Sequence, residues 1–521
     1  MGSARDGVRF DAGGQLEACH RFRVRLRSVR LSAQRSDVPP SRSCGGFDTR
    51  VKNEEAAFLL RTAKSLHLKT DDFSLILSPH GFWYCPATDH MIHQYPPGAG
   101  LILSLFHQDR RTQWALVLAM ACIALPFLLI AAEHRLQPAE IFAFAIVLLS
   151  GEQLLVDTLG AQSVPLTLGL IPLAALGAWR TFSETPAIRW TSGIALGLIS
   201  ALLLLTRITN LFVVGGLIIF LLLRLWLADG NARRSMVGPV AAALALLLIF
   251  GAVPLLIFNR INAGHFLAST YAAADAAPPQ FNWILIRQTA YYYFHESFAW
   301  RITFASILVT GCAFIVIRSA RDRGQRRALA AAAFAMLLTL SVNLVYFLTH
   351  TIRIPYYLAP GCFFIVVFGV IAFTDRPFSE DSRDRKRLLR VAAALIVLAG
   401  CVEFELRHFH PEVIRPSAPA EVTDPHSIVW ADMTSGTLLY YNGKYASKLI
   451  FAPACVQNRL IQAVYDAGRP QYFVVDSADV QNLVNRLNED VEWKRVGTYE
   501  AFGSAPIYKI AALRKRLTCP G

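Results

Sequence analysis

The sequence predicts an α-helical polytopic membrane protein with about ten or eleven transmembrane helices and a small C-terminal α/β domain. Two observations predict the membrane part. Of the 521 residues, 54% are hydrophobic and only 17% are charged, and the mean hydropathy is +0.39. A third observation, a polar tail with strand-like and helix-like patterns, predicts the C-terminal domain.

The chain begins with a basic leader, residues 1–46, that contains no apolar run. We expect this leader to be disordered, or to reflect a misassigned start that has lost a first membrane helix. Two alternatives stay open: the leader lies on the membrane surface, or the predicted number of spans is wrong by one.

A polar loop, residues 47–100, follows the leader and is dense in ionisable and aromatic side chains, including Trp83 and Tyr95. Glu54 and Glu55 open the helical pattern "NEEAAFLLRTAKSL", where carboxylates favourably face the positive end of a helix. The pair is therefore either a helix-end decoration or a catalytic group. The loop ends at Pro96 and Pro97, which predict a rigid corner before an apolar helix.

Ten apolar runs predict the membrane helices. They cover residues 112–132, 139–156, 162–179, 190–206, 209–227, 234–257, 302–317, 328–348, 354–374 and 389–404. Alternate connecting loops are rich in Lys and Arg, and the positive-inside rule places these loops in the cytoplasm. The loop 47–100, a second large loop at 258–300 and the tail then lie on the outer face, together with Arg207, Arg260 and Arg353. Each of these arginines is also readable as an ordinary headgroup anchor.

The tail, residues 411–521, predicts a small α/β domain outside the cytoplasm, because "HSIVWAD" and "QYFVVD" have the pattern of strands and residues 458–467 that of an amphipathic helix. Cys455 and Cys519 could form a disulfide if this region faces an oxidising compartment. The spacing of the nine cysteines and of the histidines shows no metal motif. The net charge of +14 is explained by membrane orientation, so no nucleic-acid partner is expected.

Several stretches, taken in order, resemble the GT-C glycosyltransferases, specifically the bacterial family 39-like lipid-linked sugar transferases related to protein mannosyltransferases and the aminoarabinose transferase. "NEEAAFLLRTAKSL", "HGFWY" and "QYPPGAGLILSLF" resemble the first outer loop of that family. "LLTRITNLF" at 204–212 is similar to its Arg/Lys-Pro-Thr turn, with Ile208 where proline is usual. "NRINAGHFLASTY" and "RIPYYLAP" resemble two later outer segments. The first membrane helix of the family, normally just upstream of the acidic pair, is missing.

The resemblance implies a GT-C-like fold over residues 47–404 and transfer of a sugar from a polyprenyl-phosphate donor to a glycan, lipid or protein acceptor on the outer face of the cytoplasmic membrane. Glu55, or its neighbour Glu54, would take the proton of the acceptor hydroxyl. Arg207, Arg260 or Arg353 would bind the donor phosphate.

Asp157 matches a further acidic position of the family and would orient the acceptor, bind a metal or simply end its helix. No cofactor is certain, and a divalent Mg²⁺ or Mn²⁺ stays open. Tyr95, Pro96, Pro97 and Trp83 would shape the substrate loop.

Two other functions compete with the transferase. A lipid or glycolipid transporter or flippase would also use outer-face arginines, although the halves of the sequence show no matching repeat. A non-catalytic membrane scaffold that binds a partner through its C-terminal domain would leave the ionisable residues of the first loop unexplained.

Overall fold

The structure is a computed structural model that describes most of the chain. The described residues are 51–68, 76–79, 81–85, 90–93, 96–105, 111–133, 138–157, 163–267, 281–297, 299–319, 323–350, 355–374, 418–500 and 504–519. The leader 1–46, the run 389–404, Tyr95 and Arg353 lie outside them.

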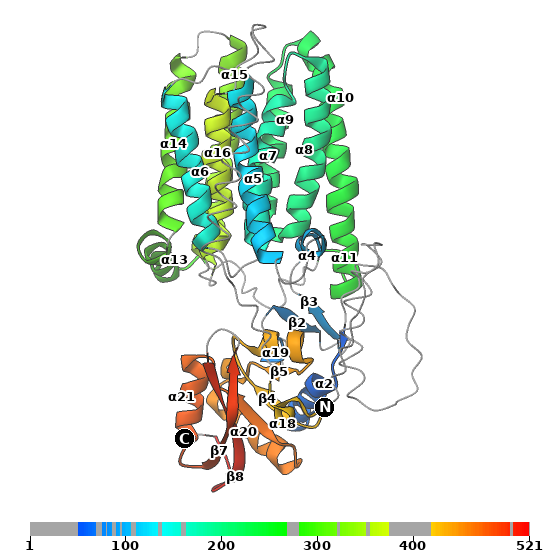
Figure 1. Ribbon diagram of the computed structural model, residues 1–521, viewed down its shortest axis with the longest axis vertical. Helices are drawn as coiled ribbons and strands as arrows, with labels where there is room; N and C mark the ends of the chain where they lie inside the picture. Colours follow the sequence, from blue (N-terminus) through cyan, green and yellow to red (C-terminus); the bar gives the residue numbers. More distant parts are fainter. Residues whose placement is uncertain are drawn as a thin grey trace, which may run out of the picture. The chain divides into compact units, whose positions relative to one another are not determined.

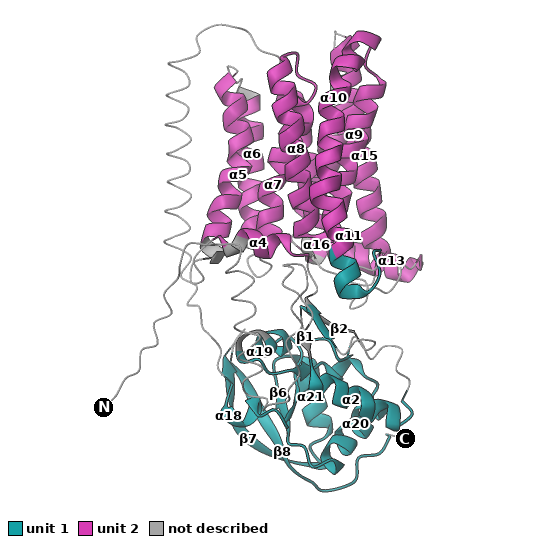
Figure 2. Cartoon of the chain, turned by 90° about the vertical axis from the view of Figure 1, so that its right-hand side faces the viewer, with its two compact units in different colours: residues 1–94, 258–275, 411–521 teal, residues 95–257, 276–410 magenta. Residues whose placement is uncertain are grey.

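Two compact units divide the chain, coloured teal and magenta in Figure 2. Residues 1–94, 258–275 and 411–521 form one, called the sheet unit below, and residues 95–257 and 276–410 form the other, called the helical unit.

Long helices make up the helical unit (Figure 1). All but the last of the ten predicted runs coincide with helices. The elements are α4 (Gly98–Ser104), α5 (Arg111–Glu133), α6 (Pro138–Asp157), α7 (Ser163–Arg180), α8 (Pro186–Thr206), η2 (Ile208–Asn210), α9 (Leu211–Trp226), α10 (Gly230–Leu247), η3 (Leu248–Ala252), α11 (Val253–Ala263, which continues into the sheet unit), α13 (Trp283–Tyr291), η4 (Tyr292–Glu296), α14 (Ala299–Ser319), α15 (Arg323–Thr349) and α16 (Pro355–Thr374).

Among the described residues, seven helices are long and apolar enough to cross a membrane. The number is eight if the pair Trp283–His295 and Ala299–Phe314, bent by 93°, is one span. The chain is therefore a multi-pass membrane protein. The larger number expected from the sequence also includes α6, which this count leaves out, and the undescribed run 389–404.

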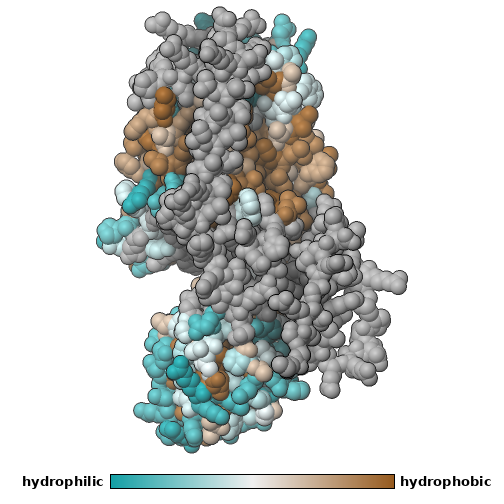
Figure 3. Space-filling model, in the orientation of Figure 1, coloured by the Kyte–Doolittle hydropathy of each residue, from teal (hydrophilic) through white to brown (hydrophobic). Residues whose placement is uncertain are grey.

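The core of the helical unit is built around α16, whose apolar window is 94% buried. This helix is apolar on all sides, which is typical of a helix surrounded by others. It packs against α7, α14 and α15. The outer surfaces of the surrounding helices carry exposed hydrophobic side chains, drawn brown in Figure 3, as expected for surfaces that contact lipid.

The sheet unit contains two β-sheets. The first has the order β1-β3-β2 and is antiparallel, and the second has the order β5-β4-β6-β8-β7. In the second sheet, β4 pairs in parallel with both β5 and β6, whereas β8 pairs antiparallel with β6 and β7. The elements are β1 (Val51–Lys52), α2 (Glu54–Ser65), β2 (Phe82–Cys85), β3 (His90–His93), α18 (Ala420–Thr423), β4 (Ile428–Trp430), α19 (Ser435–Asn442), β5 (Ala446–Ser447), η5 (Leu449–Phe451), α20 (Ala454–Asp466), β6 (Gln471–Val474), α21 (Ala478–Arg486), β7 (Val491–Glu500) and β8 (Ser504–Leu513).

Part of the first polar loop belongs to the hydrophobic core of the C-terminal domain. Ala56, Leu60 and Ala63 of α2 lie in one buried cluster with Leu460 and Val464 of α20. The domain boundaries expected from the sequence place residues 47–100 in the membrane domain. Sequence order does not show which distant segment covers an amphipathic helix, so the packing of α2 on α20 was not foreseen. In the structure the described part of the loop up to residue 93 lies in the sheet unit.

The disulfide that the sequence allowed is present. It joins Cys455 of α20 to Cys519, which follows β8, across 64 residues. This bond links the C-terminal end of the chain to α20.

Candidate functional site

The helical unit presents a buried arginine at the end of a membrane helix. Arg207 follows α8 directly in an extended conformation, so the helix ends there and the short η2 turn leads into α9. Arg207 is only 2% exposed. Its guanidinium donates to the Ser163 hydroxyl at 3.0 Å and to the Thr209 hydroxyl at 3.4 Å, and it lies 5.2 Å from the centre of the Tyr357 ring. Hydroxyls and an aromatic face therefore surround this positive charge.

A second buried polar residue, Asn210, holds the turn that carries Arg207. Its amide nitrogen donates to Leu203 O at 2.7 Å and to the hydroxyls of Thr167 and Thr206, each at 3.0 Å. The Leu203 carbonyl also accepts from the Arg207 amide at 3.3 Å and from the Thr206 hydroxyl at 2.8 Å. These bonds tie the turn to α7 and α8 and so fix the backbone next to Arg207.

The proline corner leads into α4, which packs against the end of α8 before this turn. Pro96 is buried and α4 starts two residues later. A Cβ atom placed on Gly98 would lie 2.6 Å from Leu205 O, two residues before Arg207. Only glycine allows this approach of α4 to α8. The predicted corner is therefore packed against the end of the helix that presents Arg207.

The acidic pair lies in the sheet unit at the start of α2. Asn53 is the N-cap, and its side chain accepts from Ala56 N at 2.8 Å. Glu54 is exposed. The Glu55 side chain is 17% exposed, and one of its oxygens lies 3.5 Å from Lys444 Nζ. The two neighbouring carboxylates thus have different surroundings.

Lys444 is a buried cation that sequence reasoning missed. Besides facing Glu55, its ammonium donates to Asp424 O at 2.7 Å and to Ser427 O at 2.8 Å. Burial lowers the pKa of Lys444, and the nearby Glu55 carboxylate acts in the opposite direction. No local signal identified this residue, because a lone lysine after the "NG" of a helix end is usually solvated.

The remaining predicted residues are distributed over both units. Arg260 is exposed on α11, donates to Gly264 O and lies 5.8 Å from the Phe266 ring centre. Asp157 is the last residue of α6. Trp83 lies in β2, opposite Ile92 of β3. The structure therefore brings Arg207, but not Arg260, into a buried polar cluster.

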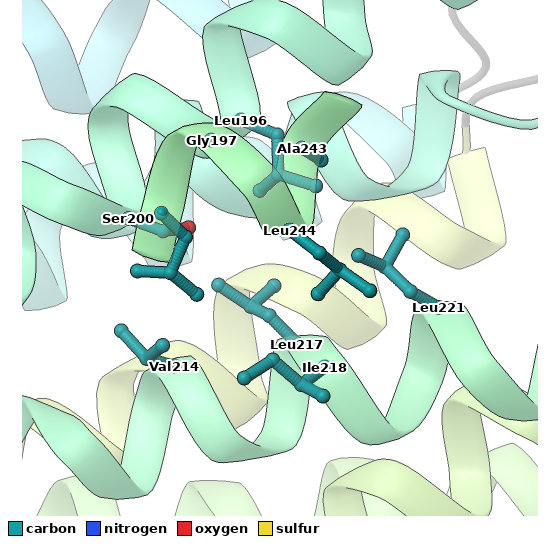
Figure 4. Close-up of a pocket in the computed structure, with 10 residues that line it drawn as sticks. Leu196, Gly197, Ser200, Val214, Leu217, Ile218, Leu221, Ala243 and Leu244 are labelled. Carbon is teal, nitrogen blue, oxygen red and sulfur yellow. The ribbon is translucent and has the colours of Figure 1, made fainter. Parts of the chain in front are cut away.

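No metal cluster accompanies these residues in the described part of the chain. No group of three or more His, Cys, Asp or Glu side chains there is arranged to hold a metal ion. A crevice between α8, α9 and α10, with Ser200 as its polar lining residue, is shown in Figure 4. Its volume of about 10 Å³ holds about one water molecule, so it is a packing defect and not a sugar site.

Comparison with known proteins gives one structural likeness. No family model and no curated protein matches the chain. The chain resembles the crystal structure of ArnT from Cupriavidus metallidurans bound to undecaprenyl phosphate, with 11% sequence identity and a TM-score of 0.44. The alignment covers 98% of this chain and 100% of that chain.

Proposed function

We propose that this protein is a membrane glycosyltransferase that moves a sugar from a polyprenyl-phosphate donor to an acceptor hydroxyl on the outer face of the cytoplasmic membrane. The observation that carries the proposal is the Arg207 cluster. A guanidinium buried at the end of a membrane helix, with hydroxyl neighbours, suits the phosphate of a lipid whose chain stays in the bilayer. The order of the sequence motifs supports sugar transfer as the reaction.

The chemistry requires one base and one stabilised leaving group. The acceptor oxygen forms a bond to the anomeric carbon while the bond from that carbon to the phosphate oxygen breaks. The acceptor proton passes to a carboxylate, for which Glu55 and Glu54 are the candidates. The departing polyprenyl phosphate gains negative charge, which the Arg207 guanidinium stabilises.

The proposed orientation places the sheet unit outside the cytoplasm. The charge distribution of the loops supports this orientation. The Cys455–Cys519 disulfide supports it as well, because such bonds persist in oxidising compartments.

The test is a transfer assay in membranes with a radiolabelled polyprenyl-phosphate sugar pool, using the wild type, Arg207→Gln, Glu54→Gln and Glu55→Gln. We expect Arg207→Gln to lower transfer by about 100-fold, since removal of one charge-stabilising donor has an effect of this order, and one of the two Gln variants to abolish it. Arg301→Gln is the matched control, because Arg301 is an exposed guanidinium 5.6 Å from the Trp300 ring centre.

Two results would contradict the proposal. One is a well-expressed wild type that transfers no sugar but moves labelled lipid across the bilayer, which would establish a transporter. The other is an Arg207→Gln variant that retains full transfer, which would remove Arg207 from the phosphate site.

A further inference from the structure

The buried ammonium of Lys444, from the C-terminal domain, faces the carboxylate of Glu55. Lys444 comes from the link between α19 and β5, and its side chain is 1% exposed. Glu55 lies almost 400 positions earlier in the sequence. The contact therefore forms only when the polar loop and the C-terminal domain fold together.

Several contacts hold Lys444 in place independently of Glu55. Gly443 ends α19 in the left-handed conformation, with φ 63°. The amide of Gly443 donates to Leu439 O, as in an αL cap, and the amide of Lys444 donates to Leu438 O. Two backbone carbonyls hold two of the three ammonium protons at 2.7 and 2.8 Å. The side of the ammonium that faces Glu55, 3.5 Å away, is left for the carboxylate.

Glu55 is fixed from the opposite side by helix α2. The Asn53 cap sets the first turn, and the apolar face of α2 packs on α20. The guanidinium of Arg469 lies 3.9 Å from the centre of the Phe58 ring, and Arg459 donates to Leu66 O at 2.5 Å. These contacts already fasten the helix to the domain, so the ion pair is not needed for that purpose.

Energetics also argues against a purely structural pair. Burial of an ammonium and a carboxylate costs about as much as their attraction returns, so such a pair contributes little net stability. What the pair does provide is a fixed position for each side chain, because each charge restricts the other to one place.

We infer that Lys444 is a positioning residue: it holds the Glu55 carboxylate in one orientation, with its exposed edge toward the acceptor hydroxyl. The inference rests on the proposed function. It gives the C-terminal domain a direct role in positioning the catalytic carboxylate.

The electrostatic surroundings of the pair define what a charge change at Lys444 would do. Asp424 and Arg469 act on Lys444 through their charges, and Tyr84 and Glu55 act on the buried Tyr445 next to it. Loss of the ammonium removes the closest positive charge from Glu55. The Glu55 carboxylate then has no partner charge there to restrict it to one place.

The experiment measures kcat and the KM for the polyprenyl-phosphate sugar in the full-length protein. Lys444→Met is expected to lower kcat by at least about tenfold and to leave KM within about twofold. Lys444→Arg restores part of kcat because it keeps the charge. Glu55→Asp, which shortens the carboxylate and leaves Lys444 in place, is expected to lower kcat without changing thermal stability.

The matched control is Lys448→Met, since Lys448 is buried in the same domain and its ammonium lies 5.2 Å from the Phe451 ring centre. It should keep the wild-type kcat. A wild-type kcat in folded Lys444→Met, or in Glu55→Asp if Lys444→Met does not fold, would overturn the inference and leave the proposed transferase function standing. So would an active Glu55→Gln beside an inactive Glu54→Gln. An inactive wild type would instead overturn the proposed function, and the inference with it.

Discussion

At the scale of single residues, two buried cations are central to this protein. Arg207 lies among hydroxyls and an aromatic ring at the end of a membrane helix. Lys444 lies between two carbonyls and a carboxylate in the sheet unit. Both are expensive to bury, and each is held by polar groups that come from different segments of the chain.

Lys444 should make the stability of the protein depend on pH in a defined direction. Burial lowers its pKa below the usual 10.5, so between the lowered value and 10.5 the unfolded chain binds more protons than the folded one. Stability contributed by this group therefore rises with pH in that window, by at most about 1.4 kcal/mol per pH unit.

The measurement is thermal unfolding of wild type and Lys444→Met between pH 7 and 10, followed by tryptophan fluorescence, to which the buried Trp430 contributes. The difference between the two proteins isolates Lys444, because Tyr445, whose pKa burial raises, is common to both. A difference that does not change with pH would contradict the prediction.

At the scale of elements, the short helix α4 explains why the polar loop ends in a proline and glycine corner. Prolines set the start of the helix, and Gly98 lets its backbone touch α8. Ala99 of α4 packs in a small cluster with Ala115 of α5 and Leu166 of α7. The corner thus joins three membrane helices near the turn that holds Arg207.

Gly98→Ala should weaken this joint. The new methyl group overlaps the carbonyl of Leu205, which is backbone and must shift, so we expect a loss of about 1–3 kcal/mol in stability and reduced transfer. Gly100→Ala is the matched control in the same helix, because a Cβ there meets nothing within 4 Å. It should be neutral or stabilise by up to about 1 kcal/mol. Equal melting temperatures for the two variants would show that the close approach is unimportant.

At the scale of the whole molecule, the chain combines a bundle of apolar helices with a sheet unit assembled from segments far apart in the sequence. The core of the sheet unit takes α2 from the first loop and α20 and β6 from the tail. Tyr445 donates to Leu77 O at 2.9 Å and Ser447 to Ile76 O at 2.9 Å, so the loop is also bound by hydrogen bonds. The sheet unit therefore forms only after both ends of the chain have been made.

The disulfide should contribute measurably to this late-forming unit. Replacement of Cys455 and Cys519 by Ser is expected to lower stability by about 2–4 kcal/mol, because the bond restricts the unfolded chain. Thermal unfolding of the double variant measures the loss, and Cys312→Ser, at an exposed free cysteine, is the control. Mass spectrometry of the intact protein from membranes checks that the bond forms in the cell. A reduced pair there would contradict the proposed outer location of the sheet unit.

Much of the helical unit follows from sequence alone. Apolar runs of membrane length predict helices because a bilayer leaves the backbone no other partner than itself, and every predicted run within the described residues is a helix. The helix that begins with Glu54 and Glu55 and the proline corner were also predictable, since each depends on local residue types, whereas the sequence only allowed the Cys455–Cys519 disulfide.

Only the tertiary structure decided which cations matter and what the first loop packs against. Arg207 and Arg260 look alike in sequence, yet one is buried among hydroxyls and the other is exposed. Lys444 gives no local signal, because its partner Glu55 is distant in the sequence. The packing of α2 on α20 brings the two residues together. Local pattern determines where helices and strands begin, whereas burial and charge pairing between distant segments depend on how those elements pack.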